Sequence, residues 1–127
     1  SGCDGLRCSP LFTGSLLEPE LRASFTGLTP QNLTPGHLTR ALLEGMAEVF
    51  YEYYKMMLPL IGARRQLVGS GNGICLNPLF QRILAERFGA PLVLPAVQEA
   101  AATGAALVAA VGVGEFEDWS AVSRWIR

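Results

Sequence analysis

Three glycines within five residues form the segment of this sequence with the clearest capacity for binding chemistry. Residues 69–73 read Gly-Ser-Gly-Asn-Gly, after a short apolar run and before a helical pattern that Asn77 and Pro78 open. Glycine lets backbone approach a ligand closely, and a helix N-terminus offers free N–H groups to an anion. The segment predicts a site for phosphate or for the polar edge of a nucleotide, although it matches neither a Walker loop nor the dinucleotide fingerprint. A tight strand-to-helix turn that needs positive φ is the alternative that these residues leave open.

A second candidate lies in the alanine-rich residues 99–106, where Glu99 precedes a run of small side chains. Small residues let a helix lie close to a sheet or to another backbone, and an acidic residue in a first helical turn suits the helix dipole. Two interpretations stay open, close packing or the wall of a ligand pocket. Residues 100–114 carry no charge but fall short of the ~20 apolar residues of a bilayer span. We therefore expect a buried helix here and no membrane segment.

A single histidine and two glutamates are the remaining candidates for catalysis. His37 needs a nucleophilic cysteine or serine beside it to act as a base, and nothing in the sequence places one there. A surface or capping role is therefore predicted for His37. Glu44 and Glu48 lie one helical turn apart, as a catalytic carboxylate pair could, but solvated helix charge is the expected role.

The elements that must position these residues alternate along the chain. Extended segments are predicted at residues 6–13, 24–28, 66–68 and 91–94. Helices are predicted from Thr34 and Pro35 to Pro59, from Asn77 to Gly89, over residues 98–111, and from Asp118 through Trp119, Val122, Trp125 and Ile126. Such alternation favours an α/β fold with a mixed sheet and flanking helices.

Composition narrows the classes of partner. The 127 residues suffice for about one domain, half of them hydrophobic and 17% charged, with a formal net charge of −1. The chain has no basic run, which excludes nucleic acid as an expected partner. One histidine and three cysteines without a Cys-x-x-Cys pair argue against a zinc site and fit the reducing cytoplasm. The first five residues are polar and glycine-rich, so no signal peptide is expected there.

Four segments, in order, resemble the signatures of the FGGY carbohydrate kinases. ASFTGL and HLTRALLE, eight residues apart, resemble the second signature of this family. GSGN with the following NPLFQRILA resembles its adenosine motif. The strand and the Gly-Ala-Ala helix that come next in the family have counterparts at residues 91–95 and 99–107. The amino-acid sequence of these segments is most similar to that of sedoheptulokinase-type and xylulokinase-like members of the family.

The resemblance implies that residues 1–127 form a single, incomplete ribonuclease H-like (actin-like ATPase) lobe, the C-terminal lobe of a sugar kinase. In such kinases the N-terminal lobe, absent here, carries the catalytic aspartate, a phosphate and magnesium motif and most of the sugar site. ATP and Mg²⁺ are the implied cofactors, and a ketose such as sedoheptulose or xylulose is the implied acceptor. We therefore expect no catalytic or metal-binding residue in this chain and no activity from it alone. The alternative is a non-catalytic module of this fold that binds a nucleotide or a partner, including a homodimer through the face that the absent lobe leaves.

The resemblance also assigns roles within the nucleotide site. Backbone at residues 69–71 would approach the ribose and the α-phosphate, two asparagines would meet the adenine or ribose edge, and residues of the alanine-rich helix would back the pocket. The complete expected set is Gly69, Ser70, Gly71, Asn72, Asn77, Glu99, Ala100 and Gly104. Ser70 and Asn72 stand where the family has glycine and alanine, and extra residues precede Asn77, so the pocket is expected to differ in shape.

Overall fold

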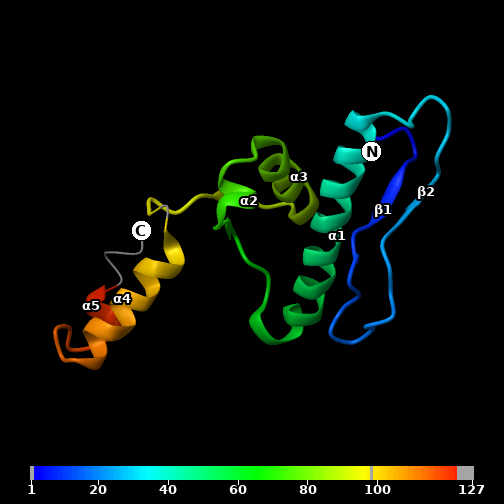
Figure 1. Cartoon of the computed structure of the whole chain (residues 1–127). Coiled ribbons are helices and arrows are strands. Elements are labelled where there is room, and N and C mark those ends of the chain that lie inside the picture. The colour runs from blue at the N-terminus through cyan, green and yellow to red at the C-terminus, as the bar shows by residue number, and fades with distance from the viewer. Residues whose placement is uncertain (1, 98, 123–127) are drawn as a thin grey trace.

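Short strands and helices alternate in this computed structural model, which describes residues 2–97 and 99–122. Their order in the chain is β1 Arg7–Ser9, β2 Ser24–Thr26, α1 Pro35–Ile61, β3 Leu67–Val68, α2 Asn72–Cys75, α3 Pro78–Phe88, β4 Leu92–Val93, α4 Ala100–Gly112 and α5 Trp119–Val122 (Figure 1). The predicted α/β class is confirmed, and each extended segment that the sequence predicts contains a strand.

Helix α1 is the longest element and begins where the sequence predicts. The side chain of Thr34 accepts a hydrogen bond from the His37 backbone N–H, and Pro35 occupies the first turn. The prediction that Pro59 ends the helix is wrong, because the helix runs to Ile61. A proline removes only its own N–H from the helical ladder and disturbs the turn before it. The helix instead ends at Gly62, whose φ is +66°.

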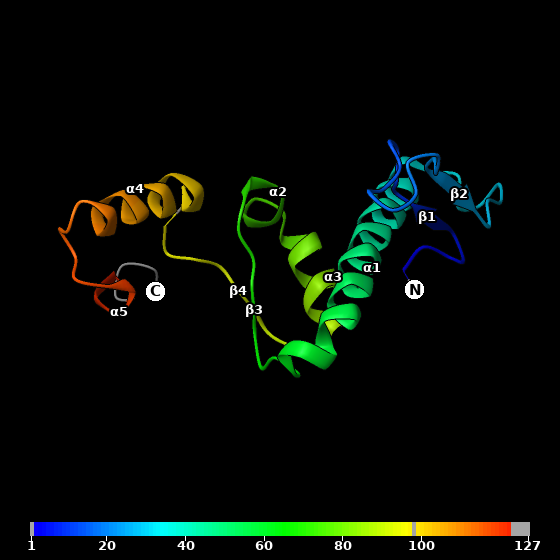
Figure 2. The same cartoon turned by 90° about the horizontal axis from the view of Figure 1, so that it is seen from below.

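The strands form two separate pairs within the described chain rather than one continuous mixed sheet. β1 pairs antiparallel with β2, with Cys8 opposite Phe25. β3 pairs parallel with β4, with Leu67 opposite Leu92, and α2 and α3 provide the crossover that a parallel pair requires. Helices α1 and α3 lie between the two pairs, as the second view shows (Figure 2).

Two clusters of buried side chains hold these elements on α1. One joins the N-terminal segment to the first half of α1 and contains Cys3, Leu6, Cys8 and Ala41. The other joins α1 to α3 and contains Ala47, Phe80, Ile83 and Leu84. Gly45 marks the closest approach of α1 to β1, because a Cβ at this position would overlap the carbonyl oxygen of Cys8.

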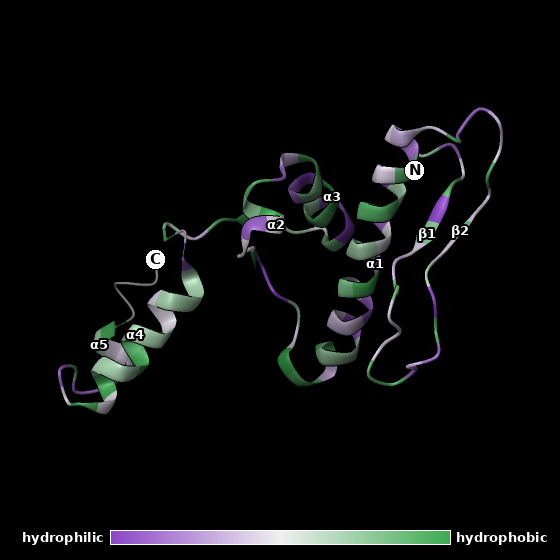
Figure 3. Ribbon diagram, in the orientation of Figure 1, coloured by the Kyte–Doolittle hydropathy of each residue, from purple (hydrophilic) through white to green (hydrophobic). Residues whose placement is uncertain are grey.

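Helix α4 departs most from the sequence-based expectation. It was predicted to be buried, yet none of its described residues is buried, and it lies away from α1 and α3 in both views. Its residues are almost all apolar or small, as the colouring shows (Figure 3). A helix that is apolar all round requires a partner that covers it, and none of the other described elements packs extensively on it. Of the residues predicted for the third and fourth helices, Gln98, Trp125 and Ile126 lie outside the described residues.

The described helices also bear on the membrane prediction. None of them combines the length and the apolar character that crossing a bilayer demands.

Candidate functional site

The glycine-rich turn follows β3 directly, and its three glycines differ in what the fold requires of them. The Gly69 N–H donates to the Val93 carbonyl at 2.9 Å, and a Cβ at Gly69 would lie 2.8 Å from the Ile74 side chain. Gly71 has a φ of +84°, which favours glycine. Gly73 has neither a positive φ nor a neighbour close enough to exclude a Cβ. A Cβ at Gly71 or Gly73 would have nothing within 4 Å, so the turn needs two glycines for its own shape and still leaves open space at its tip.

A single turn of helix, α2, follows the turn, where the sequence predicted only a loop before the next helix. The N–H groups of Ile74 and Cys75 donate to the Gly71 carbonyl at 3.1 and 2.9 Å. The helix capped by Asn77 begins at Pro78, as predicted, and α2 is an additional turn between the glycines and that helix. Three consecutive N–H groups are enough to close a short turn of helix through local hydrogen bonds. The sequence has no capping residue there from which α2 could be predicted.

Asn77 caps α3 as predicted, since its side-chain oxygen accepts the Phe80 N–H at 3.0 Å. This bond uses one of the two lone pairs of the oxygen, and among the described residues the amide nitrogen of Asn77 has no hydrogen-bond acceptor. Sequence reasoning missed Gln81, whose amide nitrogen donates to the Ile74 and Cys75 carbonyls at 2.8 and 3.1 Å. Its position one turn into α3 is a usable signal, because helical side chains lean toward the N-terminus of their helix.

The predicted residues of α4 are less engaged than those of the turn. Glu99 is the N-cap residue of α4 rather than part of its first turn, and its side chain makes no capping hydrogen bond. Ala100 opens the helix. Within the described chain a Cβ at Gly104 would have nothing within 4 Å, so close packing at this glycine stays a prediction for the whole enzyme. The structure thus brings together the turn and Asn77, while Glu99, Ala100 and Gly104 lie on an exposed helix that forms no closed wall beside them.

A hollow of about 760 Å³ lies elsewhere, between β1 and α1, and Glu44 and Glu48 contribute to its lining. Both carboxylates are paired. Arg40 binds Glu44 at 2.9 Å, and the Arg87 Nη2 binds Glu48 at 2.7 Å. The hydrogen bond from Arg87 holds the pKa of Glu48 below its ordinary value. A carboxylate whose pKa is lowered in this way is unsuited to general acid catalysis. Both glutamates are helix charges, as expected, but each is paired with an arginine and not simply solvated.

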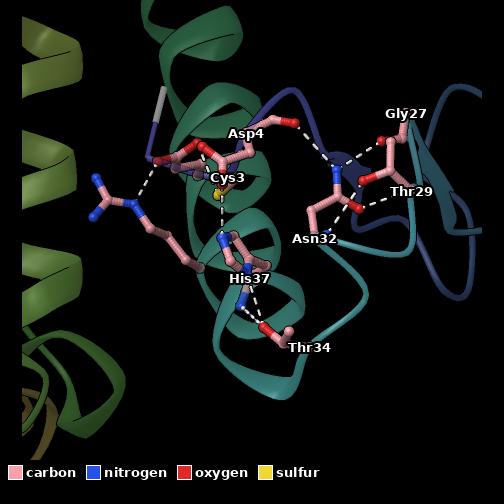
Figure 4. Close-up of polar contacts among 9 residues, drawn as sticks. Cys3, Asp4, Gly27, Thr29, Asn32, Thr34 and His37 are labelled. Carbon is pink, nitrogen blue, oxygen red and sulfur yellow. Dashed lines mark hydrogen bonds and ion pairs between the residues drawn. The ribbon is translucent and has the colours of Figure 1, made fainter.

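His37 has a capping and linking role, as the close-up shows (Figure 4). Its Nδ1 lies 2.7 Å from the Thr34 hydroxyl oxygen, and its Nε2 lies 3.3 Å from a carboxylate oxygen of Asp4. Neither partner is an activated nucleophile. Cys3 and Cys8 are buried free thiols, and burial raises the pKa of each, which makes both poor nucleophiles at neutral pH.

The same corner contains a buried polar residue that sequence reasoning missed. Asn32 is fully buried, and its amide nitrogen donates to the carbonyls of Asp4 and Gly27 at 3.1 and 2.9 Å. Its side-chain oxygen accepts the Thr29 N–H at 2.8 Å. Because all of these partners are backbone groups, the network ties the loop between β2 and α1 to the N-terminal segment at Asp4 and uses Asn32 for structure (Figure 4). The turn-forming sequence Thr-Pro-Gln-Asn was the available signal.

Clusters that could hold a metal ion are absent from the residues that the structure describes, when groups of three or more His, Cys, Asp or Glu side chains are sought.

Comparison with known proteins places these observations in a family. The FGGY family of carbohydrate kinases, C-terminal domain, matches residues 9–113. A glycerol kinase of Bdellovibrio bacteriovorus is 32% identical over 126 residues, which cover 97% of this chain and 25% of that protein. The xylulose kinase of Rhodospirillum rubrum superposes with a TM-score of 0.76 at 35% identity, over 94% of this chain and 24% of that one.

A third relative was solved with a nucleotide. The structure of Plasmodium falciparum glycerol kinase with ADP matches with a TM-score of 0.74 at 25% identity, over 94% of this chain and 24% of its own. This chain spans about a quarter of the length of these relatives. The structural likeness confirms the predicted actin-like ATPase fold, of which the described elements are a part. The chain therefore belongs to the FGGY family of carbohydrate kinases and corresponds to its C-terminal domain.

Proposed function

We propose that this chain is the nucleotide-binding lobe of an ATP-dependent kinase that phosphorylates a hydroxyl group of a carbohydrate. The observation that carries the proposal is the open glycine-rich turn after β3 in a chain of the FGGY family. The presence of ADP in the related Plasmodium falciparum glycerol kinase supports an adenine nucleotide as the ligand.

The turn would bind and orient the nucleotide through its backbone. Gly69 is buried against Ile74, so it fixes the start of the turn. Ser70, Gly71 and Asn72 are exposed beyond it, and we assign the ribose and the α-phosphate to the backbone there. Asn72 and the free amide nitrogen of Asn77 would contact the adenine or ribose edge.

The topology supports the inclusion of α4 in the same site. The turn leaves the carboxyl end of β3, and the segment that leads to α4 leaves the carboxyl end of β4. These two strands are parallel neighbours, so both segments start from the same edge. Ligands of open α/β sheets bind outside the carboxyl ends of the strands. We therefore propose that Glu99, Ala100 and Gly104 form the far wall of the nucleotide pocket.

Catalysis requires parts that this lobe does not supply. Phosphoryl transfer depends on positioning and on neutralisation of the phosphate charges, and the described residues offer no acidic cluster for Mg²⁺. We assign the catalytic base, the metal site and most of the carbohydrate site to an N-terminal lobe of the whole kinase, which we place in the cytoplasm. Closure of the two lobes would exclude water from the reaction. The isolated chain is accordingly proposed to bind nucleotide without turnover.

The acceptor and the second candidate function are tested together. We propose a ketose such as xylulose or sedoheptulose, because a related solved structure is a xylulose kinase; other relatives are glycerol kinases, which makes glycerol the main competitor. A coupled ADP-release assay on the complete protein, run with each of the three, discriminates among them. Nucleotide binding without phosphorylation of any acceptor would favour the second candidate, a non-catalytic module.

The exposed apolar side of α1 indicates where a partner would pack. Phe50, Tyr53, Met57 and Leu60 are exposed and recur at helical spacing. We propose that the remainder of the kinase covers this side. A homodimer of the isolated chain through the same side is the alternative, and sedimentation of the chain with and without a Met57→Lys substitution detects it.

Nucleotide binding itself is tested by isothermal titration calorimetry of the chain with ADP. We expect saturable binding that the Asn72→Ala variant weakens. Heat of dilution alone at millimolar ADP would contradict the proposal.

A further inference from the structure

Helix α3 is tied to the glycine-rich turn by a side chain that lies outside the proposed nucleotide site. Gln81, half-buried on α3, donates from one amide nitrogen to two carbonyl oxygens, those of Ile74 and Cys75. The amide group of glutamine has two N–H donors, so these two bonds use its whole donor capacity. Both acceptors lie at the end of α2, the single turn of helix that opens from the glycines.

Helix α2 depends on contacts from outside itself. It has four residues, none of them buried, and so short a helix is unstable alone. The last carbonyls of any helix lack partners within it. Gln81 donates to two of these carbonyls, of which that of Ile74 also accepts the Asn77 N–H at 3.1 Å, and thereby anchors the end of α2 on the longer and partly buried α3.

The position of α2 is transmitted to the turn by several contacts, one of which is the hydrogen bond from the Cys75 thiol to the Gly69 carbonyl at 3.9 Å. The Gly71 carbonyl accepts the N–H groups of Ile74 and Cys75, so a displacement of α2 moves the backbone of Gly71. The Ile74 side chain occupies the space beside Gly69 in which a Cβ would stand. If α2 shifts, the backbone at both glycines loses the support that holds it in one conformation.

We propose that Gln81 is a positioning residue for the adenine nucleotide, a role that rests on the proposed function. Gln81 does not contact the nucleotide. Its amide holds α2 so that Gly71 and Asn72 keep a binding conformation before the nucleotide arrives. Such preorganisation raises affinity, because less conformational freedom is lost on binding.

Three variants of the chain separate this role from a general effect on folding. Gln81→Met removes both donors at nearly constant volume, and Gln81→Lys keeps a donor on a side chain of sufficient length. Gln66→Met is the matched control, since Gln66 is exposed and precedes β3. The dissociation constant for ADP is measured by calorimetry, and amide hydrogen exchange is measured in parallel by NMR.

We expect Gln81→Met to weaken ADP binding about tenfold, the scale of one to two lost hydrogen bonds. Amide exchange should accelerate at residues 74–76 and stay unchanged in α1. Gln81→Lys should recover most of the affinity, and Gln66→Met should bind like the wild type.

Two results would overturn the inference. If Gln81→Met binds ADP as tightly as the wild type, Gln81 has no positioning role, while the proposed nucleotide site stands. If the wild-type chain and all variants fail to bind ADP, the proposed function fails and the role of Gln81 fails with it.

Discussion

The close approach of α1 to β1 makes Gly45 a position of the helix at which an added side chain should be destabilising. A Cβ at Gly45 would overlap the Cys8 carbonyl oxygen and lie 3.3 Å from Cδ of Pro10. Alanine is favoured over glycine in a helix interior by about 1 kcal/mol. The overlap is with backbone, so no rotamer change relieves it, and overpacking of this kind costs about 1–3 kcal/mol, here near the upper limit. We therefore expect Gly45→Ala to lower the free energy of unfolding by about 2 kcal/mol.

The same substitution in α4 is the matched control with the opposite sign. Gly104 lies within α4, and a Cβ there would have nothing within 4 Å. Gly104→Ala should therefore add about 0.5–1 kcal/mol of helix stability. Urea unfolding of the chain, followed by far-ultraviolet circular dichroism, measures both variants, with amide exchange in α4 as a local readout. A Gly45→Ala variant as stable as the wild type would refute the close contact of α1 with β1. Destabilisation by Gly104→Ala would show that α4 is closely packed, as its sequence suggests.

Three further substitutions test separate parts of the structure. Asn77→Ala removes the cap that accepts the Phe80 N–H and should destabilise the chain by about 1 kcal/mol in urea unfolding. Asn32→Ala leaves three backbone groups without their buried partner and should cost about 2–4 kcal/mol by the same measurement. Glu48→Gln removes a half-exposed ion pair with Arg87 and should cost about 0.5 kcal/mol at neutral pH. Because the pKa of Glu48 is lowered in the folded state, its contribution is present above the ordinary glutamate pKa of about 4.3 and is lost as the pH falls through the folded value. The difference between wild type and Glu48→Gln in acid titrations of stability should therefore vanish at low pH, and a difference that grows there would contradict the pairing.

Most helices and strands could be predicted from residues close together in the sequence. The features that were missed depend on contacts between segments that are farther apart in the chain. Thr34 and Asn77 announce their helices because a cap acts within three residues of chain. The turn of α2 has no such signal, and its carbonyls accept hydrogen bonds from Gln81 of the next helix. Pro59 was misread because its effect falls on the turn before it, so the helix could continue to Gly62.

The candidate site also has features that the sequence predicts and features that only the structure shows. Composition alone identifies the glycines as candidates. Only the structure separates Gly69, where a Cβ would collide with the Ile74 side chain, from Gly73, where a Cβ would have open space. The burial of α4 could not be predicted, because burial depends on what covers a helix as well as on how apolar it is.

Nucleotide binding at the glycine-rich turn is the central claim, and titration of the isotopically labelled chain with ADP by NMR tests it most directly. We predict chemical shift changes at residues 69–77 and at the start of α4, and the Asn72→Ala variant should require more ADP to produce the changes at both segments. Shift changes centred instead on the hollow between β1 and α1, or no change at millimolar ADP, would contradict the claim.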